Sequence, residues 1–323
     1  MYIVTGGAGF IGSAVVAQLN AEGIDDVVVV DELGTSDKWQ NLVHQRYSDF
    51  IDKHEFIARV LEGSFTDQVT AVFHLGACSS TTETDADYLL HNNFLYSRDL
   101  ADWALKNGAR FVYASSAATY GDGSQGFSDD DSVTPSLRPL NMYAYSKQLM
   151  DTWALRTGAA EKIVGLKYFN VFGPNEYHKE DMQSVVLKAF EQIKETGKVK
   201  LFKSHRSDFA DGEQRRDFVY VKDCAKITTW FLGKPEVNGI YNVGTGASGT
   251  WLELVRAVFS AMGKQESIEF VDMPLELQGK YQYFTEANMT KLRSAGYTDE
   301  FTSLSTAVKD YVQNYLMQDD RYL

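Results

Sequence analysis

The first half of the chain alternates short runs of β-branched and aromatic residues with longer segments of helical pattern. The short runs predict strands, and the longer segments predict helices. The predicted strands cover residues 2–5, 27–30, 71–75, 110–115 and 162–170, and the predicted helices cover residues 11–22, 88–106 and 143–156. Because strands that alternate with helices pair in parallel, this half is expected to be α/β, with a Rossmann-type, doubly wound parallel sheet.

The pattern becomes mixed after Pro174. Helices are predicted at residues 183–195, 251–262 and 303–316, and strands at residues 199–202, 217–221 and 240–243, with a polar loop at 204–216. We expect the strand at 240–243 to return to the large sheet. The predicted domains are a sheet domain, residues 1–172 with about 222–245, and a smaller α+β lobe, residues 173–221 with 246–323.

Composition and charge argue against several classes of function. The 323 residues include 31 lysines and arginines against 44 aspartates and glutamates, and the net charge of −13 disfavours a general nucleic-acid or anionic-membrane surface. No apolar stretch approaches the roughly 18 residues of a membrane span, and residues 1–6 read as a strand without a basic leader. Cys78 and Cys224 form no disulfide framework, and HxxH or CxxC zinc spacings are missing. We therefore expect a cytoplasmic protein without a metal.

A glycine-rich turn follows the first predicted strand directly. Gly6, Gly9 and Gly12 have the spacing GxxGxxG. Without Cβ atoms the backbone can turn sharply and bring its N–H groups and the start of the next helix against a pyrophosphate. Asp31 ends the second predicted strand about 20 residues later, where an acid meets the hydroxyls of an adenosine ribose. The pattern predicts a dinucleotide site.

The residues around Asp31 leave the choice between NAD and NADP open. Asp31 alone favours NAD because a carboxylate repels a 2′-phosphate. Lys38 and Lys53 are candidates to reverse that preference, although most lysines are simply solvated surface residues.

Tyr143 and Lys147 form a YxxxK pattern within a predicted helix, so the two residues share one helix face. A tyrosine with a pKa near about 10 is a poor base at neutral pH, and a nearby ammonium group stabilises its phenolate. Ser116 follows the predicted strand 110–115 at its carboxyl edge, where ligands bind in open α/β sheets. The three residues predict proton transfer from a substrate alcohol as hydride leaves its carbon.

Several motifs together give the chain a family resemblance over essentially its whole length. Those shared with many relatives are the glycine turn, the YxxxK pair, and segments 114–121 (ASSAATYG) and 168–174 (YFNVFGP). The chain thus resembles the extended short-chain dehydrogenases/reductases that act on sugar nucleotides. More discriminating are segment 74–83 (HLGACSSTTE), the pair His178 and Lys179, and segments 216–221 (RDFVYV) and 279–285 (GKYQYFT). These resemble the ADP-L-glycero-D-manno-heptose 6-epimerases within that superfamily.

The resemblance implies an isomerase with tightly bound NADP, or NAD as the alternative. Such epimerases oxidise the substrate carbon transiently to a carbonyl, let the intermediate turn, and return the hydride to the opposite face. The implied substrate is an ADP-sugar, ADP-glycero-manno-heptose, inverted at C6″ from D-glycero to L-glycero to supply heptose for the inner core of lipopolysaccharide. The resemblance also implies a homo-oligomer, with a pentamer as the candidate size.

The motif match assigns roles to individual residues. Tyr143 and Lys179 would be bases on opposite sides of the substrate, with Ser116 and Lys147 completing the catalytic set; without the resemblance, Lys179 reads as a solvated loop residue. The implied cofactor-binding residues are Gly6, Gly9, Phe10, Ile11, Gly12, Asp31, Glu32, Lys38, Lys53, Leu75, Gly76, Ala77, Cys78, Ser79, Asn92, Lys147, Val171 and Lys179. The implied substrate-binding residues, largely from the smaller lobe, are Ser116, Asn170, Asp181, Lys188, Phe202, Arg216 and Tyr281.

Arg216 is expected to grip the substrate diphosphate, since a guanidinium makes two parallel hydrogen bonds to phosphate. Arg215 is its competitor, but consecutive strand residues point to opposite faces, so only one should reach the cleft, and the match selects Arg216.

The chain departs from the family pattern at two places. Glu32 stands where the family commonly has Asn, which weakens the preference for NADP, and Glu180 and Asp181 stand where Gly and Ser are expected. His178 and His205 could be read as metal ligands, but no companion acids at ligand spacing accompany them.

Two alternative functions are weighed against the epimerase. Another sugar-nucleotide epimerase or a dehydratase has the same fold, but a dehydratase needs an acid beside the active-site serine or threonine, and residues 116–119 (SAAT) contain none. A non-catalytic NADP-sensing binding module usually loses the tyrosine or the lysine, and both are present here.

Overall fold

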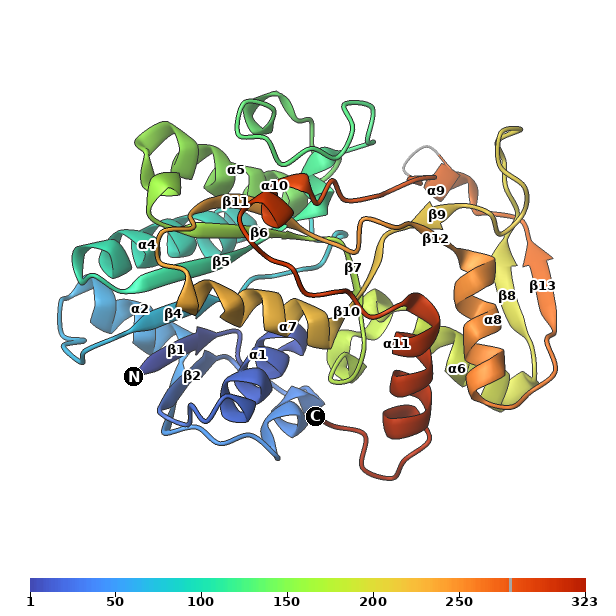
Figure 1. Ribbon diagram of the computed structural model, residues 1–323, viewed down its shortest axis with the longest axis horizontal. Coiled ribbons are helices and arrows are strands. Elements are labelled where there is room, and N and C mark those ends of the chain that lie inside the picture. The colour runs from blue at the N-terminus through green and yellow to red at the C-terminus, as the bar shows by residue number, and fades with distance from the viewer. Residues whose placement is uncertain (279–280) are drawn as a thin grey trace.

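The computed structural model describes residues 1–278 and 281–323 (Figure 1). Its centre is a seven-stranded sheet of order β11-β6-β5-β4-β1-β2-β3, in which each neighbouring pair is parallel. The strands are β1 (Tyr2–Thr5), β2 (Val27–Asp31), β3 (Asp49–Asp52), β4 (Ala71–His74), β5 (Arg110–Ser116), β6 (Val164–Tyr168) and β11 (Gly239–Val243). The predicted Rossmann-type parallel sheet is confirmed.

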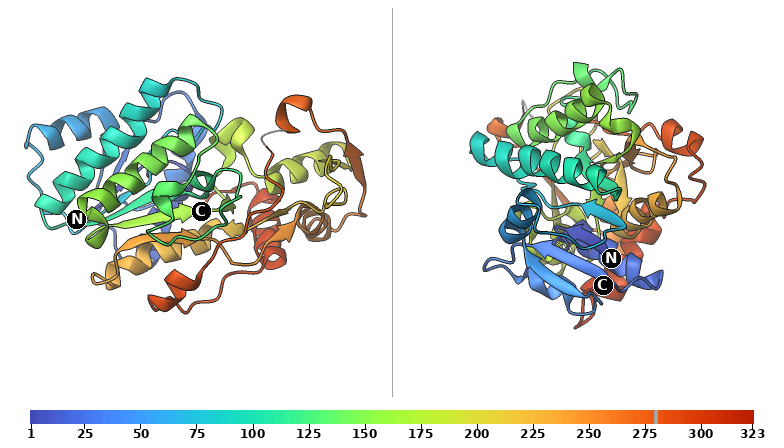
Figure 2. Two further views of the ribbon diagram at one scale, coloured as in Figure 1. Left: turned by 90° about the horizontal axis from the view of Figure 1, so that it is seen from above. Right: turned by 90° about the vertical axis from the view of Figure 1, so that its left-hand side faces the viewer.

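Successive residues of the central strands are buried on opposite faces of this sheet. Ile3 and Val28 pack on one face, whereas Val4 and Val29 pack on the other. Helices cover both faces (Figure 2): α2 (Lys53–Leu61), α4 (Tyr96–Lys106) and α5 (Met142–Thr157) on the first, and α1 (Phe10–Ala21) and α7 (Val221–Trp230) on the second. Because both faces are buried, the central strands are almost continuously apolar.

A smaller group of elements lies to the right of the large sheet in Figure 1. There β8 (Val199–Phe202) pairs in parallel with β13 (Ile268–Val271), next to α6 (Val185–Thr196), α8 (Trp251–Ala261) and α11 (Leu304–Tyr311). Two short strand pairs connect the two parts: β7 (Asn170–Phe172) with β10 (Phe218–Tyr220), and β9 (Arg215–Arg216) with β12 (Gly249–Thr250). The short helices are α3 (Ala86–Leu89), α9 (Leu275–Gln278) and α10 (Thr290–Ser294).

The structure differs from the predicted elements at several places. The helix expected at 88–106 is divided into α3, a π-helical segment (Leu90–Leu95) and α4. The strand expected at 162–170 ends at Tyr168, and Asn170 begins β7 in another sheet. The sequence pattern also missed α2, α7 and β3. The strand β3 gives a weak pattern because it is an edge strand with exposed Asp49 and Asp52.

The strand expected at 240–243 does return to the large sheet, as β11 beside β6. Within the described ranges, no helix has both the length and the apolar character needed to cross a membrane.

Candidate active site

A cavity of about 730 Å³ opens at the carboxyl ends of the parallel strands. Residues at the ends of β1, β2, β4, β5 and β6 line it, and so do Trp251 and Gln282, from much later in the chain. This edge is where open α/β sheets bind their ligands. The large sheet and the smaller group of elements therefore build one site together.

The glycine turn at one end of the cavity has no room for side chains. Gly6 has a φ of +66°, and a Cβ on it would lie 2.6 Å from the backbone nitrogen of Gly76. A Cβ on Gly12 would lie 1.9 Å from the carbonyl oxygen of Gly6. Gly9 is the N-cap of α1, so free N–H groups at the start of that helix lie at the cavity wall. This backbone cradle fits the pyrophosphate of a dinucleotide.

Asp31 connects the glycine turn to the lysines that the sequence singled out. Its carboxylate accepts a hydrogen bond from the Ala8 amide at 2.9 Å and one from Lys38 Nζ at 2.7 Å. Lys53 Nζ lies 2.5 Å from the carboxylate of Glu32, and this ion pair lowers the pKa of Glu32. Both lysines therefore lie beside the end of β2, each opposed by one carboxylate.

The residues predicted to bind the cofactor all line this cavity: Gly6, Gly9, Phe10, Ile11, Gly12, Asp31, Glu32, Lys38, Lys53, Leu75, Gly76, Ala77, Cys78, Ser79, Asn92, Lys147, Val171 and Lys179. Sequence reasoning missed Asn93, whose side chain exchanges two hydrogen bonds of 2.9 Å with the backbone of Cys78 and also donates to Ser146 on α5. Asn93 thus ties the wall after β4 to α5, the helix that carries Tyr143 and Lys147.

Ser116, Tyr143 and Lys147 meet at the cavity from two elements, the end of β5 and the first turns of α5. Burial raises the pKa of Tyr143, and its hydrogen bond with Ser116 acts in the opposite direction. Lys147 Nζ donates to the carbonyl of Ala114 at 2.9 Å. Burial lowers the pKa of Lys147 to about 8, while the carboxylate of Asp151 opposes this. Lys147 is thus still mostly an ammonium ion at neutral pH, one helix turn from Tyr143.

Lys179 lies in the short helical segment Tyr177–Met182 between β7 and α6. Its ammonium group lies 5.0 Å from the ring centre of Phe10, at the glycine turn. Burial lowers its pKa, and the buried carboxylate of Glu176 opposes that effect. The next residue, Glu180, has a φ of +48°, a conformation that favours glycine, which is the residue expected there.

Two sets of contacts hold this Lys179 segment in place. Glu176 accepts hydrogen bonds from the Gly173 amide and from the Ser184 hydroxyl, and so joins the two ends of the loop. The end of the chain provides the second set: Tyr177 donates to the carbonyl of Arg321 at 2.6 Å, and the Leu323 amide donates to Asn175 at 3.0 Å.

The predicted substrate-binding residues divide into two groups. Ser116 and Asn170 line the cavity, whereas among the residues described the following do not: Asp181, Lys188, Phe202, Arg216 and Tyr281. Lys188 Nζ donates to the Asp181 carbonyl at 2.6 Å, and Phe202 ends β8. Gly279 and Lys280, which belong to the predicted motif 279–285, lie outside the described residues.

Arg216 lies directly behind the cavity wall. It is 6% exposed, and its guanidinium carbon is 5.6 Å from the ring centre of Trp251 and 5.2 Å from that of Tyr281. It also donates to the carbonyl of Gln282. Arg215 turns the other way and donates to Ser248, as the alternation along a strand predicts.

Two histidines that line the cavity, His74 and His178, have lowered pKa values. Burial lowers the pKa of His74 to about 3, and its ring lies between the hydroxyls of Thr5 and Ser97, each at 2.7 Å. Burial lowers the pKa of His178 to about 4, with Lys38 and Lys179 adding to the effect. Within residues 1–278 and 281–323, no three side chains of histidine, cysteine, aspartate or glutamate gather where they could hold a metal ion.

Known proteins resemble this chain over its full length. The NAD dependent epimerase/dehydratase family matches residues 2–244. A protein named ADP-L-glycero-D-manno-heptose-6-epimerase from Nitratidesulfovibrio vulgaris is 57% identical over 323 residues, and one of the same name from Fusobacterium nucleatum is 48% identical, each match covering 100% of both chains.

Solved structures agree with these matches. The crystal structure of ADP-L-glycero-D-manno-heptose-6-epimerase from Helicobacter pylori has a TM-score of 0.80 at 26% identity, covering 97% of this chain and 95% of that one. UDP-glucose 4-epimerase from Thermus thermophilus, in complex with NAD, has a TM-score of 0.72 at 26% identity, covering 96% of this chain and 97% of that one. The expectation of an epimerase that uses a nicotinamide cofactor is confirmed, and the chain belongs to the NAD dependent epimerase/dehydratase family.

Proposed function

We propose that this epimerase inverts C6″ of ADP-glycero-manno-heptose from the D-glycero to the L-glycero form, with NADP as its bound cofactor. The observation that carries the proposal is the 57% identity, over the whole chain, to an enzyme named for that reaction. Ser116, Tyr143, Lys147 and Lys179 support it, because all four line one cavity. The product would supply heptose for the inner core of lipopolysaccharide.

Tyr143 is the proposed base for the oxidation half of the reaction. A bound nicotinamide dinucleotide supplies the acceptor for the hydride of C6″ and later its donor. As the C6″–H bond breaks, Tyr143 takes the hydroxyl proton, and Ser116 donates a hydrogen bond to the same oxygen. Because burial raises the pKa of Tyr143, the ammonium of Lys147 and the hydrogen bond with Ser116 are needed to stabilise the phenolate.

Lys179 is the proposed base for the second half. Inversion requires the hydride to return to the other face of the carbonyl, so the intermediate turns and its oxygen meets a different proton donor. Lys179 comes from the loop after β7, an element distinct from the helix that carries Tyr143. Burial lowers its pKa below the ordinary range of a lysine, which favours its use as a group that gives and takes protons.

Lys38 and Lys53 support NADP over NAD. A 2′-phosphate beside the end of β2 would meet two ammonium groups, whose advantage is reduced because Lys38 pairs with Asp31 and Lys53 with Glu32. Lys38→Ala is therefore expected to weaken NADP binding about tenfold and to leave NAD binding almost unchanged. Titration calorimetry of the apoprotein with both dinucleotides measures this, with exposed Lys162→Ala as the control. Tighter binding of NAD than of NADP by the parent would overturn the assignment.

Arg216 is the proposed anchor for the substrate diphosphate. The chain carries a net charge of −13, so an anionic nucleotide sugar needs a local cation in the cavity. To reach the phosphates, Arg216 must exchange its bond to the Gln282 carbonyl for bonds to the ligand.

Arg216→Lys should raise KM for the nucleotide sugar about 10- to 100-fold with little change in kcat, for a loss of roughly 1.5 to 3 kcal/mol of binding. Steady-state kinetics measure the effect, with Arg215→Lys as the matched control. A larger effect in the control would place the anchor at Arg215.

The proposed function itself is tested with ADP-D-glycero-manno-heptose and the purified protein in deuterated water. NMR spectroscopy should show the L-glycero epimer with its C6″ proton retained, because the hydride returns within the site. Absorbance at 340 nm should show no release of NADPH. A product that has lost water would favour a dehydratase, and unchanged substrate in the presence of bound NADP would reject the substrate assignment.

A further inference from the structure

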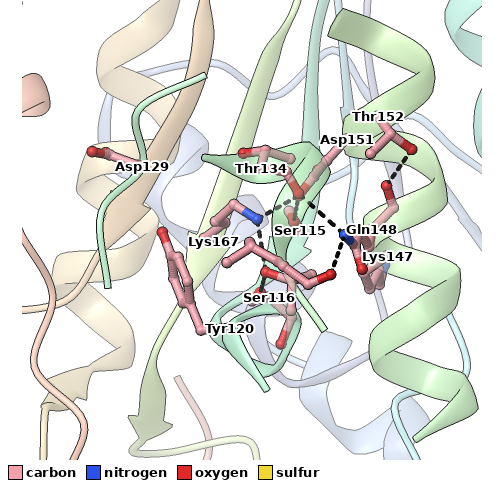
Figure 3. Close-up of polar contacts among 12 residues, drawn as sticks. Ser115, Ser116, Tyr120, Asp129, Thr134, Lys147, Gln148, Asp151, Thr152 and Lys167 are labelled. Carbon is pink, nitrogen blue, oxygen red and sulfur yellow. Dashed lines mark hydrogen bonds and ion pairs between the residues drawn. The ribbon is translucent and has the colours of Figure 1, made fainter. Parts of the chain in front are cut away.

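A fully buried ion pair lies behind the catalytic serine and lysine (Figure 3). The ammonium group of Lys167, on β6, is 2.6 Å from the carboxylate of Asp151, on α5, and both side chains are 0% exposed. Taking two charges out of water costs about as much as their attraction returns, so such a pair is weak evidence for a role in stability. Neither residue takes part in the proton transfers described above.

The Asp151 carboxylate joins α5 to the end of β5. It accepts hydrogen bonds from the hydroxyl of Tyr113 at 2.9 Å and from that of Ser115 at 2.7 Å. These two strand residues share one face of the sheet. Together with Lys167, they give the carboxylate three donors.

Lys167 reaches the other side of Ser116. Its ammonium also donates to the hydroxyl of Thr119 at 2.7 Å, and that hydroxyl donates to the carbonyl of Ser116 at 2.8 Å. The backbone before Ser116 is thus held through Ser115 and Asp151, and the backbone after it through Thr119 and Lys167. Figure 3 shows Ser115, Asp151 and Lys167 from this network, together with Ser116 and Lys147.

Asp151 also lies one helix turn after Lys147, on the same face of α5. Lys147 in turn donates to the carbonyl of Ala114, in the strand that ends with Ser116. The catalytic lysine and the catalytic serine are therefore connected to the same carboxylate, one through the helix and one through the strand.

We propose that Asp151 and Lys167 are positioning residues for the proton transfer at Tyr143: the pair locks the carboxyl end of β5 to α5, and Asp151 supplies the negative charge that faces Lys147. The inference rests on the proposed function for the identity of the reaction. The effect of Asp151 on the protonation of Lys147 does not depend on which reaction the enzyme catalyses.

The groups around Lys147 make the two members of the pair distinguishable. The titratable and charged groups around Lys147 are Asp151, Tyr143, Cys78 and His74, and Tyr113, Tyr120 and Asp129 face the ion pair of Asp151 with Lys167. Asp151 and Cys78 raise the pKa of Lys147 against the effect of burial. Lys167 bonds directly to Asp151 and is not among the charges that shift the pKa of Lys147. Asp151→Asn should therefore lower the pKa of Lys147, whereas Lys167→Met should leave it unchanged or raise it.

The test compares Asp151→Asn, Lys167→Met and the conservative Lys167→Arg with the parent. Acetylation of Lys147 in each apoprotein, followed by peptide mass spectrometry over a range of pH, reports directly when its amine becomes neutral. We expect the midpoint to fall by about one pH unit in Asp151→Asn and to stay at or above the parent value in both Lys167 variants. The alkaline limb of kcat against pH should move with it, and Lys167→Arg should keep the parent profile.

Ser115→Ala keeps both charges and removes one bond between β5 and Asp151, so it covers the case in which a charge variant fails to fold. It should lower kcat several-fold with KM little changed. An unchanged midpoint in Asp151→Asn, or full kcat in Ser115→Ala, would overturn the inference. A parent that titrates as expected but does not act on the ADP-heptose would reject the proposed function and leave this inference intact.

Discussion

Replacing Tyr143 with phenylalanine should lower kcat for epimerisation by about 10²- to 10⁴-fold, the range over which a positioned acid or base contributes to catalysis. The change removes the hydroxyl proposed to take the substrate proton and keeps the ring in the first turn of α5. Because the glycine turn and the proposed diphosphate anchor, Arg216, are untouched, cofactor affinity and KM should change little. NMR kinetics and calorimetry measure these quantities separately.

Tyr145→Phe is the matched control for this experiment. Tyr145 lies on the same helix two residues later, is 48% exposed and, among the described residues, is not one of those that line the cavity. It should keep the parent kcat. Equal rates in Tyr143→Phe and the parent would mean that another group takes the proton.

Replacing Lys179 with methionine should lower kcat for epimerisation by at least about 10²-fold. The reason is that the carbonyl intermediate, once it has turned, would lack the proton donor proposed for its second face. Methionine keeps an apolar side chain over the ring of Phe10, so the local packing should survive. Dismutation of an aldehyde analogue, which can use Tyr143 alone, should retain partial activity. The comparison of the two reactions separates loss of one base from loss of the whole site.

Two further variants make the Lys179 result specific. Lys194→Met changes an exposed lysine on α6 and should have no effect. Lys147→Met should impair both half-reactions alike, since Lys147 is proposed both to stabilise the phenolate of Tyr143 and to bind the cofactor. Parent-level epimerisation in Lys179→Met would show that a single base is sufficient.

The glycine turn, Asp31 and the pair Tyr143 and Lys147 could be predicted from the sequence for a physical reason. Each depends on residues close together in the chain, and the rule that ligands lie at the carboxyl edge of a parallel sheet places them in space. The resemblance extended this to residues such as Val171 and Lys179, which do line the cavity. The division into domains and the homo-oligomer stay predictions. Analytical ultracentrifugation would test whether the protein forms a homo-oligomer.

The rest depends on which distant residues the fold brings together. Lys167 appears in the sequence as one charge in an apolar strand, and only the fold, which pairs β6 with β5 and packs α5 against β5, shows that it meets Asp151. Arg216 was expected at the cleft, and its orientation opposite to Arg215 is as expected. Arg216 lies behind Trp251 and Gln282, which come from later segments of the chain. The alternation of side chains along a strand cannot predict that contact.

The attachment of the last residues to the Lys179 loop decides how the protein should be prepared for these measurements. Leu323 and Arg321 bond to Asn175 and Tyr177, so an affinity tag fused after Leu323 would begin beside the loop that carries a proposed base. A change in activity caused by the tag would then imitate a catalytic defect. A tag joined to Met1, whose amino group pairs with Asp26 at the opposite edge of the sheet, would leave that loop undisturbed.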